Sequence, residues 1–394
     1  MMETADFAVE EARQVSLGPT LWTVVSRFLI HGLVVSTWVS RIPGIQSALS
    51  LSNAALGLCL LGTAVGSVAA VPVSGWLITR YGSKRVAAWS TAGFCLALAA
   101  PSLAGTAGAL FAALVLFGAM AGANDVAINS QGVAVETALG SPVMSRLHAM
   151  FSVGGMAGAT LGGLAASHGL APEPHFFLAS ALLLIPSLAT GRLLFDAHDN
   201  VSKHSQPFSV RRMPAVLFAL IAIGFCMFLS EGAMADWTAV YLKQALFAGP
   251  GLAAAGYAVF SGGMAIFRLL GDSITRRLGA VRTVRVFALC AAVGLTLALA
   301  APSAAWALPG FALTGAGFSV IVPLAFAAGG RVRSIPRSAG IALVTGSGYI
   351  GFLFGPPFIG LAAQHISLRY ALFLVVLLSL LAAALAGAVR PQES

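Results

Sequence analysis

The chain has 394 residues, of which 58% are hydrophobic and only 9% are charged, whereas an ordinary soluble domain has about 25% charged residues. Its formal net charge is +9, but the basic residues are scattered at the ends of apolar segments instead of forming one basic face, which argues against nucleic-acid binding. This composition excludes a soluble globular domain and predicts a protein of the lipid bilayer.

The first 19 residues are polar and precede the first apolar segment. They contain Glu3, Asp6, Glu10 and Glu11 and lack the apolar core of a cleavable signal peptide. We therefore interpret residues 1–19 as a cytoplasmic tail and expect the first membrane helix itself to direct insertion.

Twelve apolar stretches follow, each close to the ~20 residues that cross a bilayer as a helix. Membrane β-strands would be about 10 residues long with strict alternation, which these stretches do not show. The sequence therefore predicts an all-α membrane protein whose transmembrane helices lie at approximately 20–41, 54–78, 86–104, 107–133, 146–168, 175–195, 214–242, 252–274, 284–303, 306–329, 339–363 and 369–389.

Basic residues predict the orientation, because cytoplasmic ends of spans are enriched in Lys and Arg. With the N-terminus inside, 17 of the 22 basic residues fall on the cytoplasmic side. The outer side receives Arg41, Lys243 and Arg369, and Arg27 and Arg268 fall within spans. Both termini are therefore predicted to be cytoplasmic, including a short tail at 390–394.

The two halves of the chain repeat at an offset of 197 residues. This shift superimposes Arg80 on Arg277, Gly82 on Gly279 and six further pairs. Because each half has an even number of spans, the halves share one orientation, which is a parallel duplication. We therefore expect two six-helix bundles at 20–195 and 214–389, joined by a polar cytoplasmic linker at 196–213.

Residues 75–85 (GWLITRYGSKR) connect the second and third predicted spans. They resemble the signature loop of the major facilitator superfamily, in which a glycine, three residues and an acid precede R-x-G-x-K-R; the matching residues are Gly75, Arg80, Gly82, Lys84 and Arg85. Thr79 stands where the family has the acid, which puts in question the charge pair that this acid supplies to the inner gate. Its hydroxyl can still cap a helix.

Further segments extend the resemblance over nearly the whole chain. They resemble the MosC-like group, a relative of fucose and other sugar permeases, at 38–43 (WVSRIP), 124–129 (NDVAIN), 231–237 (EGAMADW) and 268–272 (RLLGD). The resemblance implies a rocker-switch carrier in which spans 1, 4, 7 and 10 line a central cavity and spans 3, 6, 9 and 12 face lipid. Consistently, the apolar cores of spans 3, 6, 9 and 12 contain no Asp, Glu or Lys.

Polar residues within spans are candidates for the solute and proton pathway, because a charge in hydrocarbon persists where it faces a partner or a water-filled path. Asp125 and Asn129 share one face of span 4, and Glu231 lies in the outer half of span 7. For these residues a structural hydrogen bond or a buried structural acid is the alternative. The predicted pathway also includes Asn124, His31 and His148, and for the two histidines packing in the core is the alternative.

Two charge pairs are predicted near the ends of the spans. Arg41 and Asp236 are placed near the outer ends of spans 1 and 7, where an ion pair would latch the outer mouth; separate solvation is the alternative. Arg268 and Asp272 are four residues apart near the inner end of span 8 and are expected to neutralise each other. We assign Arg268 and Asp272 to the inner gate.

Four aromatic residues are predicted to lie in or beside the cavity: Trp38, Trp237, Phe318 and Tyr349. A ring face beside polar groups suits a sugar or another polyhydroxylated solute. For Trp38 and Trp237, anchoring at the membrane interface is an equal alternative, because Trp is enriched there.

Three classes of function fit these patterns. The first is a proton-coupled carrier that takes up a small sugar-like or other polar organic solute across the bacterial inner membrane. The second is a drug or metabolite efflux antiporter, and the third is a receptor or scaffold without transport. We find no nucleophile–base pair, metal-ligand cluster or nucleotide-binding loop, so the sequence predicts neither an enzyme nor a cofactor or metal. The expected partners are lipid, the solute and protons, without nucleic acid, and nothing demands more than a monomer.

Overall fold

The computed structural model describes residues 2–195, 213–333 and 335–390, with the backbone alone for residues 2–17. The regular elements of the described residues are helices, and 12 helical stretches are long and apolar enough to cross a membrane. The prediction of an all-α protein with 12 spans is therefore confirmed. Most of the predicted linker at 196–213, and the tail after Arg390, lie outside the described residues.

The first six spans are α1 (Met2–Ala48), α2 (Asn53–Tyr81), α3 (Ser83–Ala97, followed by η1, Ala100–Leu103), α4 (Ala107–Leu139), α5 (Met144–Ser167) and α6 (Pro172–Thr190, followed by η2, Gly191–Leu193). The second six are α7 (Ala215–Ala245), α8 (Pro250–Leu278), α9 (Ala280–Ala300), α10 (Ala304–Phe318) with α11 (Ile321–Gly329), α12 (Arg337–Ile366) and α13 (Leu368–Leu385, followed by η4, Ala386–Val389). Helix α1 begins at Met2, so it includes residues that we expected to form a tail.

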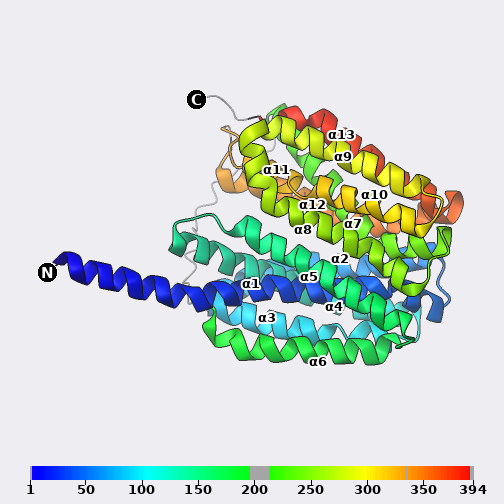
Figure 1. The fold of residues 1–394 in the computed structure, drawn as a ribbon, viewed down its shortest axis with the longest axis horizontal. Helices are drawn as coiled ribbons and strands as arrows, with labels where there is room; N and C mark the ends of the chain where they lie inside the picture. Colours follow the sequence, from blue (N-terminus) through cyan, green and yellow to red (C-terminus); the bar gives the residue numbers. More distant parts are fainter. Residues whose placement is uncertain (1, 196–212, 334, 391–394) are drawn as a thin grey trace.

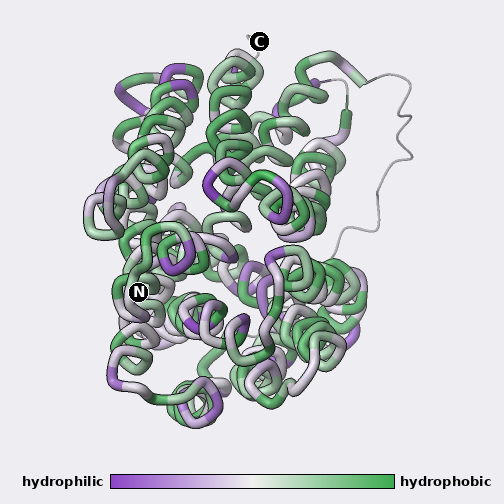
Figure 2. The backbone as a smooth tube through the Cα atoms, turned by 90° about the vertical axis from the view of Figure 1, so that its right-hand side faces the viewer, coloured by the Kyte–Doolittle hydropathy of each residue, from purple (hydrophilic) through white to green (hydrophobic). Residues whose placement is uncertain are grey.

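The helices form two groups, with α1 to α6 in one and α7 to α13 in the other (Figure 1). Figure 2, which looks along the helices, shows the two groups one above the other, with hydrophobic residues along much of the backbone of both. Following the orientation predicted from the basic residues, we call the end with the α1–α2 and α7–α8 connections the outer end. The end with the α2–α3 and α8–α9 connections is the inner end.

Turn residues at the helix ends follow the internal repeat. Gly82 separates α2 from α3 with a φ of 80°, and its counterpart Gly279 separates α8 from α9 with a φ of 75°. A side chain would strain the backbone at such positive φ angles, which explains a glycine at both positions. At the outer end, the Ser52 and Thr106 side chains accept hydrogen bonds from the amides of Ala55 and Ala109 and so cap α2 and α4.

The predicted tenth span is interrupted between α10 and α11, at Ser319 and Val320. Pro323 follows four residues after Ser319, so the Ser319 carbonyl loses its helical amide partner and would collide with the proline ring. The Ser319 hydroxyl donates to the Ala316 carbonyl at 2.6 Å, at the end of α10. Two shorter helices therefore complete a single crossing of the membrane.

Helix pairs α2–α12 and α5–α8 join the two groups at close range. A Cβ atom added at Gly57 of α2 would lie 2.7 Å from the Pro356 carbonyl oxygen of α12, and one added at Gly155 of α5 would lie 2.9 Å from Ser261 Oγ of α8. Glycine at these positions lets the helix backbones approach closely. The groups therefore meet along two tight seams, and the candidate site lies between them.

Candidate functional site

A cavity of about 420 Å³ lies between the two groups, and it is lined from both of them. Helix α4 contributes most of the lining and α12 faces it, while Met144 at the start of α5 closes one side. The lining residues are Asp125, Val126, Asn129, Ser130, Val133, Met144, Thr345 and Tyr349. Met144 begins α5 and Val133 lies in the last two turns of α4, so the cavity extends along the inner halves of the helices.

Asp125, Asn129 and Tyr349 are the predicted pathway residues that line this cavity. The Asn129 side-chain amide donates to Asp125 Oδ1 at 3.0 Å and to the Asp125 carbonyl at 2.8 Å. Tyr349 comes from the other half of the chain and lies within electrostatic reach of Asp125. A carboxylate, an amide and a phenol therefore face one space, and this set can hydrogen-bond a polar solute.

Asn124 and His31, by contrast, are buried inside the N-terminal group. The Asn124 amide contacts His31 Nδ1 at 2.9 Å, and its oxygen accepts a hydrogen bond from the Thr91 hydroxyl at 2.6 Å. The His31 ring also packs against Phe94 and Phe151. These contacts tie α1, α3 and α4 together, so they support the packing alternative for His31 and give Asn124 the same structural role.

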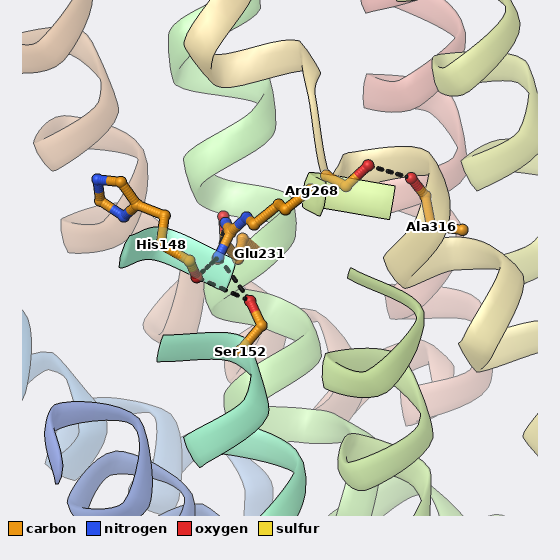
Figure 3. A network of polar contacts seen from close by, with 6 residues as sticks. His148, Ser152, Glu231, Arg268 and Ala316 are labelled. Atoms are coloured by element: carbon orange, nitrogen blue, oxygen red, sulfur yellow. Dashed lines mark hydrogen bonds and ion pairs between the residues drawn. The ribbon is translucent and has the colours of Figure 1, made fainter. Parts of the chain in front are cut away.

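Glu231, close to the middle of α7, pairs with Arg268 of α8, at 3.5 Å between Oε1 and Nη2 (Figure 3). The Arg268 guanidinium also reaches across to α5, where it donates to Ser152 Oγ at 2.7 Å and to the His148 carbonyl oxygen at 3.2 Å. The predicted pairing of Arg268 with Asp272 is wrong, because Asp272 is exposed and Arg268 binds Glu231. Arg268 therefore connects a C-terminal carboxylate to the N-terminal group, and His148 takes part through its backbone.

At the outer end, hydrogen bonds join α7 to the α1–α2 region of the other group. Lys243 Nζ donates to the Pro43 carbonyl at 3.0 Å and to Ser47 Oγ at 2.6 Å. The Gln244 side chain donates to Asn53 Oδ1 at 3.0 Å and to Gln46 Oε1 at 3.2 Å, and it accepts from Asn53 Nδ2 at 3.1 Å. We call these six residues the outer tie. It holds the two groups together on the side opposite the cavity.

The predicted latch between Arg41 and Asp236 is not formed. Buried Arg41 donates to the Leu170 carbonyl in the α5–α6 connection, within its own group. Asp236 is half-buried on α7 and makes no ion pair with any residue that the structure describes. The contact between the outer ends of α1 and α7 exists, but other side chains make it.

Three of the four predicted aromatic residues belong to the core. Trp38 is 2% exposed and packs near the rings of Phe117 and Phe176. Trp237 is fully buried, and Phe318 lies against Phe260. Trp38 and Trp237 are therefore buried in this structure, where they contact neither the membrane interface nor the cavity.

The signature loop lies at the inner end, outside the cavity lining. The Thr79 hydroxyl donates to the Trp76 carbonyl at 2.7 Å within the last turns of α2. Arg80 and Arg85 are exposed, Gly75 and Lys84 are half-buried, and Gly82 makes the turn described above. The Thr79 hydroxyl thus bonds to a carbonyl of its own helix, and Thr79 carries no charge that could form the inner-gate charge pair of the family.

The sequence predicts neither the outer tie nor the role of Ser152. Lys243 is one of three basic residues on the predicted outer side, and Gln46, Asn53 and Gln244 are uncharged, so no charge pattern in the sequence marks them. Among the described residues, no group of three His, Cys, Asp or Glu side chains is placed to hold a metal ion.

The sequence matches known transporters over most of its length. A family model described as Major Facilitator Superfamily matches residues 24–333. An uncharacterised transporter of this type from Yersinia pestis is 38% identical over 364 residues, which cover 92% of this chain and 94% of that protein. Membrane protein MosC from Rhizobium meliloti is 30% identical over 368 residues, which cover 92% of this chain and 88% of MosC.

The fold is similar to those of solved transporters. A variant of the nucleoside transporter NupG superimposes with a TM-score of 0.76 at 12% identity, over 94% of this chain and 100% of that one. A D-xylose-proton symporter gives a TM-score of 0.70 at 16% identity, over 93% of this chain and 97% of that one. At these identities the likeness shows a shared fold.

Proposed function

Since this chain belongs to the major facilitator superfamily of membrane transporters, we propose that it moves a small polar organic solute across the bacterial inner membrane by alternating access, together with protons. The family model and the relatives confirm the resemblance at the signature loop and in the MosC-like segments, and they show that the protein is a transporter and not an enzyme. The solute class, the proton coupling, the membrane and the monomeric state are the proposal.

One observation carries this proposal: the two groups are tied at one end and separated by a cavity at the other. The outer tie joins α7 to α1 and α2 through five hydrogen bonds between the groups. The cavity lies between α4 and α12 toward the inner end. A carrier that alternates must close one end while the other admits solute, and this arrangement corresponds to the inward-facing state.

The cavity lining supports a solute rich in hydroxyl groups. Asp125 accepts hydrogen bonds, Asn129, Ser130 and Thr345 both donate and accept, and Tyr349 adds a ring and a hydroxyl. Such a set can bind hydroxyls of a sugar-like molecule while the ring packs against its apolar face. Structural neighbours include a nucleoside transporter and a D-xylose-proton symporter, and their solutes also carry several hydroxyls.

Proton coupling is proposed to act through Glu231, with Asp125 as the second candidate. Arg268 holds Glu231 in its own group and Ser152 in the other. A proton on Glu231 removes the countercharge of Arg268, and a half-buried guanidinium without a countercharge is unfavourable. Protonation therefore changes the energy of a contact that spans both groups.

The test uses purified protein in vesicles with a pH-sensitive dye inside, and sugars, polyols, nucleosides and drugs added outside. A symporter acidifies the lumen when its solute enters, whereas an antiporter makes the lumen alkaline. Glu231→Gln or Asp125→Asn should abolish the signal at whichever site carries the proton. Exposed Glu173→Gln, at the start of α6, is the matched control and should leave the signal intact.

A signal of the opposite sign would favour the efflux antiporter. A solute flux without any proton movement would show that transport is not coupled to protons. If both Glu231→Gln and Asp125→Asn retain full coupling, the assignment of the proton site is wrong.

A further inference from the structure

We propose that the inner end of α2 and the start of α3 form a binding site for the phosphate group of an anionic membrane phospholipid. The site consists of Trp76, Arg80, Tyr81 and Trp89, which we call the Trp76 cluster. It lies on the outside of the N-terminal group, and it is independent of the solute and the proton.

The Trp76 cluster is a continuous row of rings around one guanidinium. The Trp76 and Tyr81 ring centroids lie 6.5 Å apart, and those of Tyr81 and Trp89 lie 5.7 Å apart. The Arg80 guanidinium carbon is 5.8 Å from the Trp76 ring centroid and 5.6 Å from that of Tyr81, and its Nε donates to the Tyr81 hydroxyl at 3.2 Å. The rings therefore fix the position of Arg80, and no hydrogen bond from its Nη atoms to another described residue is present.

These large side chains face outward. Trp76 and Trp89 are each 56% exposed, whereas Trp is highly buried on average in soluble proteins. On the same helices, Val73 of α2 and Leu96 of α3 are also more than half exposed. The cluster thus lies on helices that carry further exposed apolar side chains, of the kind that acyl chains cover in a membrane.

The depth of each group matches a phospholipid at the membrane boundary. Trp76 precedes the end of α2 by five residues, or about 7.5 Å at 1.5 Å per residue, and Trp89 lies about 9 Å inside the start of α3. Arg80 is one turn closer to the helix end than Trp76. Rings at the level where the acyl chains begin, with a cation above them, place the guanidinium beside the phosphate.

Charge complementarity selects an anionic lipid. Arg80 makes no ion pair with a carboxylate among the residues that the structure describes, and Thr79 supplies no negative charge beside it. Glu136, a carboxylate of the same group, is occupied by the backbone amides of Val143 and Met144. Arg85, which is exposed, follows at the start of α3. A headgroup with a net negative charge fits this surface, and it would be attracted to the basic inner end.

The test measures quenching of tryptophan fluorescence by lipids with brominated acyl chains. The protein carries Trp22→Phe and Trp306→Phe, which remove the exposed tryptophans outside the cluster. It is placed in phosphatidylcholine vesicles that contain either brominated phosphatidylglycerol or brominated phosphatidylcholine at the same low mole fraction. A contribution of about 1 kcal/mol per basic residue corresponds to about fivefold enrichment of the anionic lipid at the cluster, so the brominated phosphatidylglycerol should quench several times more strongly.

Arg80→Gln should remove this preference, because the substitution deletes the charge and leaves the rings in place. Arg277→Gln is the matched control, since Arg277 is the exposed repeat counterpart of Arg80 at the inner end and has no aromatic partner among the described contacts. Equal quenching by the two brominated lipids in the parent protein would overturn the proposal. Competition by millimolar glycerol 1-phosphate at matched ionic strength would also overturn it, because the site would then bind a free phosphate instead of a lipid.

Discussion

Substitution of Lys243 by Met should open the outer end of the protein. Lys243 is half-buried and donates to the Pro43 carbonyl and to Ser47 Oγ, at 3.0 and 2.6 Å. Methionine keeps the length and the apolar stem but removes both bonds. These bonds exist only when α7 meets α1, so their loss acts on the closed arrangement alone.

The magnitude follows from hydrogen bonds that involve a charged donor, which contribute about 1.5–3 kcal/mol when shielded from water. Ser47 is exposed, and solvent screening lowers the value toward that of surface pairs. We therefore expect a loss of about 1.5 kcal/mol, which lowers the ratio of outward-closed to outward-open molecules about tenfold.

The assay is a distance measurement between two spin labels, at Ala107→Cys and Ser303→Cys, in protein that lacks the four native cysteines. Both positions are exposed at the outer end, one in each group, and neither belongs to the outer tie. The Lys243→Met protein should show a larger population of long distances than its parent. Arg369→Gln is the control, because Arg369 lies at the same end and interacts with Tyr241 of its own group.

The reasoning would be refuted by identical distance distributions in the Lys243→Met protein and its parent. An equal change in the Arg369→Gln protein would also refute it, because the effect would then depend on outer charge in general.

Three further substitutions test other parts of the structure. Gly57→Ala adds a methyl group 2.7 Å from the Pro356 carbonyl oxygen and should lengthen the same spin-label distance, whereas Gly75→Ala, with nothing within 4 Å, should not. Asn124→Ala leaves His31 Nδ1 without its partner, at a cost of about 1–3 kcal/mol, and should lower the unfolding temperature in detergent by about 1–4 °C for a chain of this length; an unchanged temperature would contradict a structural role. Gln131→Leu removes the bonds to both backbone groups of Phe195, at 2.9 and 2.8 Å, and should speed hydrogen exchange at Phe195 about tenfold, as mass spectrometry would detect; unaltered exchange would count against this anchor.

The spans could be predicted from the sequence because the length and hydrophobicity of a membrane helix are local properties. The outer tie could not be predicted in this way, because a run of apolar residues shows which part of a helix lies in lipid but not where the helix ends. Helix α1 continues to Ala48, beyond the predicted limit of 41, and α7 continues to Ala245, beyond 242. Gln46, Ser47, Lys243 and Gln244 all lie on these extensions. The predicted latch therefore used Arg41 and Asp236, which lie too far back from the helix ends.

The candidate site shows the same limit at the scale of single residues. Asn124 and Asp125 are adjacent in sequence, but consecutive residues point about 100° apart around a helix, so one faces the core and the other lines the cavity. Arg268 has two candidate acidic partners, Asp272 four residues later on α8 and Glu231 on α7. Exposed Asp272 is solvated by water, whereas Glu231 is more costly to leave unpaired, and this difference depends on tertiary burial that local spacing does not reveal.

The outer tie and the Arg268 connection, which join the groups in the described part of the chain, differ in whether they contain a carboxyl group. The outer tie consists of an ammonium group, side-chain amides, a hydroxyl and a backbone carbonyl, and it contains no carboxyl or imidazole group. The connection through Arg268 depends on the carboxylate of Glu231. In the proposed cycle, a proton that enters from the cavity would therefore act on the α5–α8 contact and leave the outer tie chemically unchanged. In the proposed cycle, opening of the outer end must then follow from movement of the groups transmitted from the Arg268 connection, so Glu231→Gln should alter the spin-label distances at the outer end although Glu231 makes no contact there.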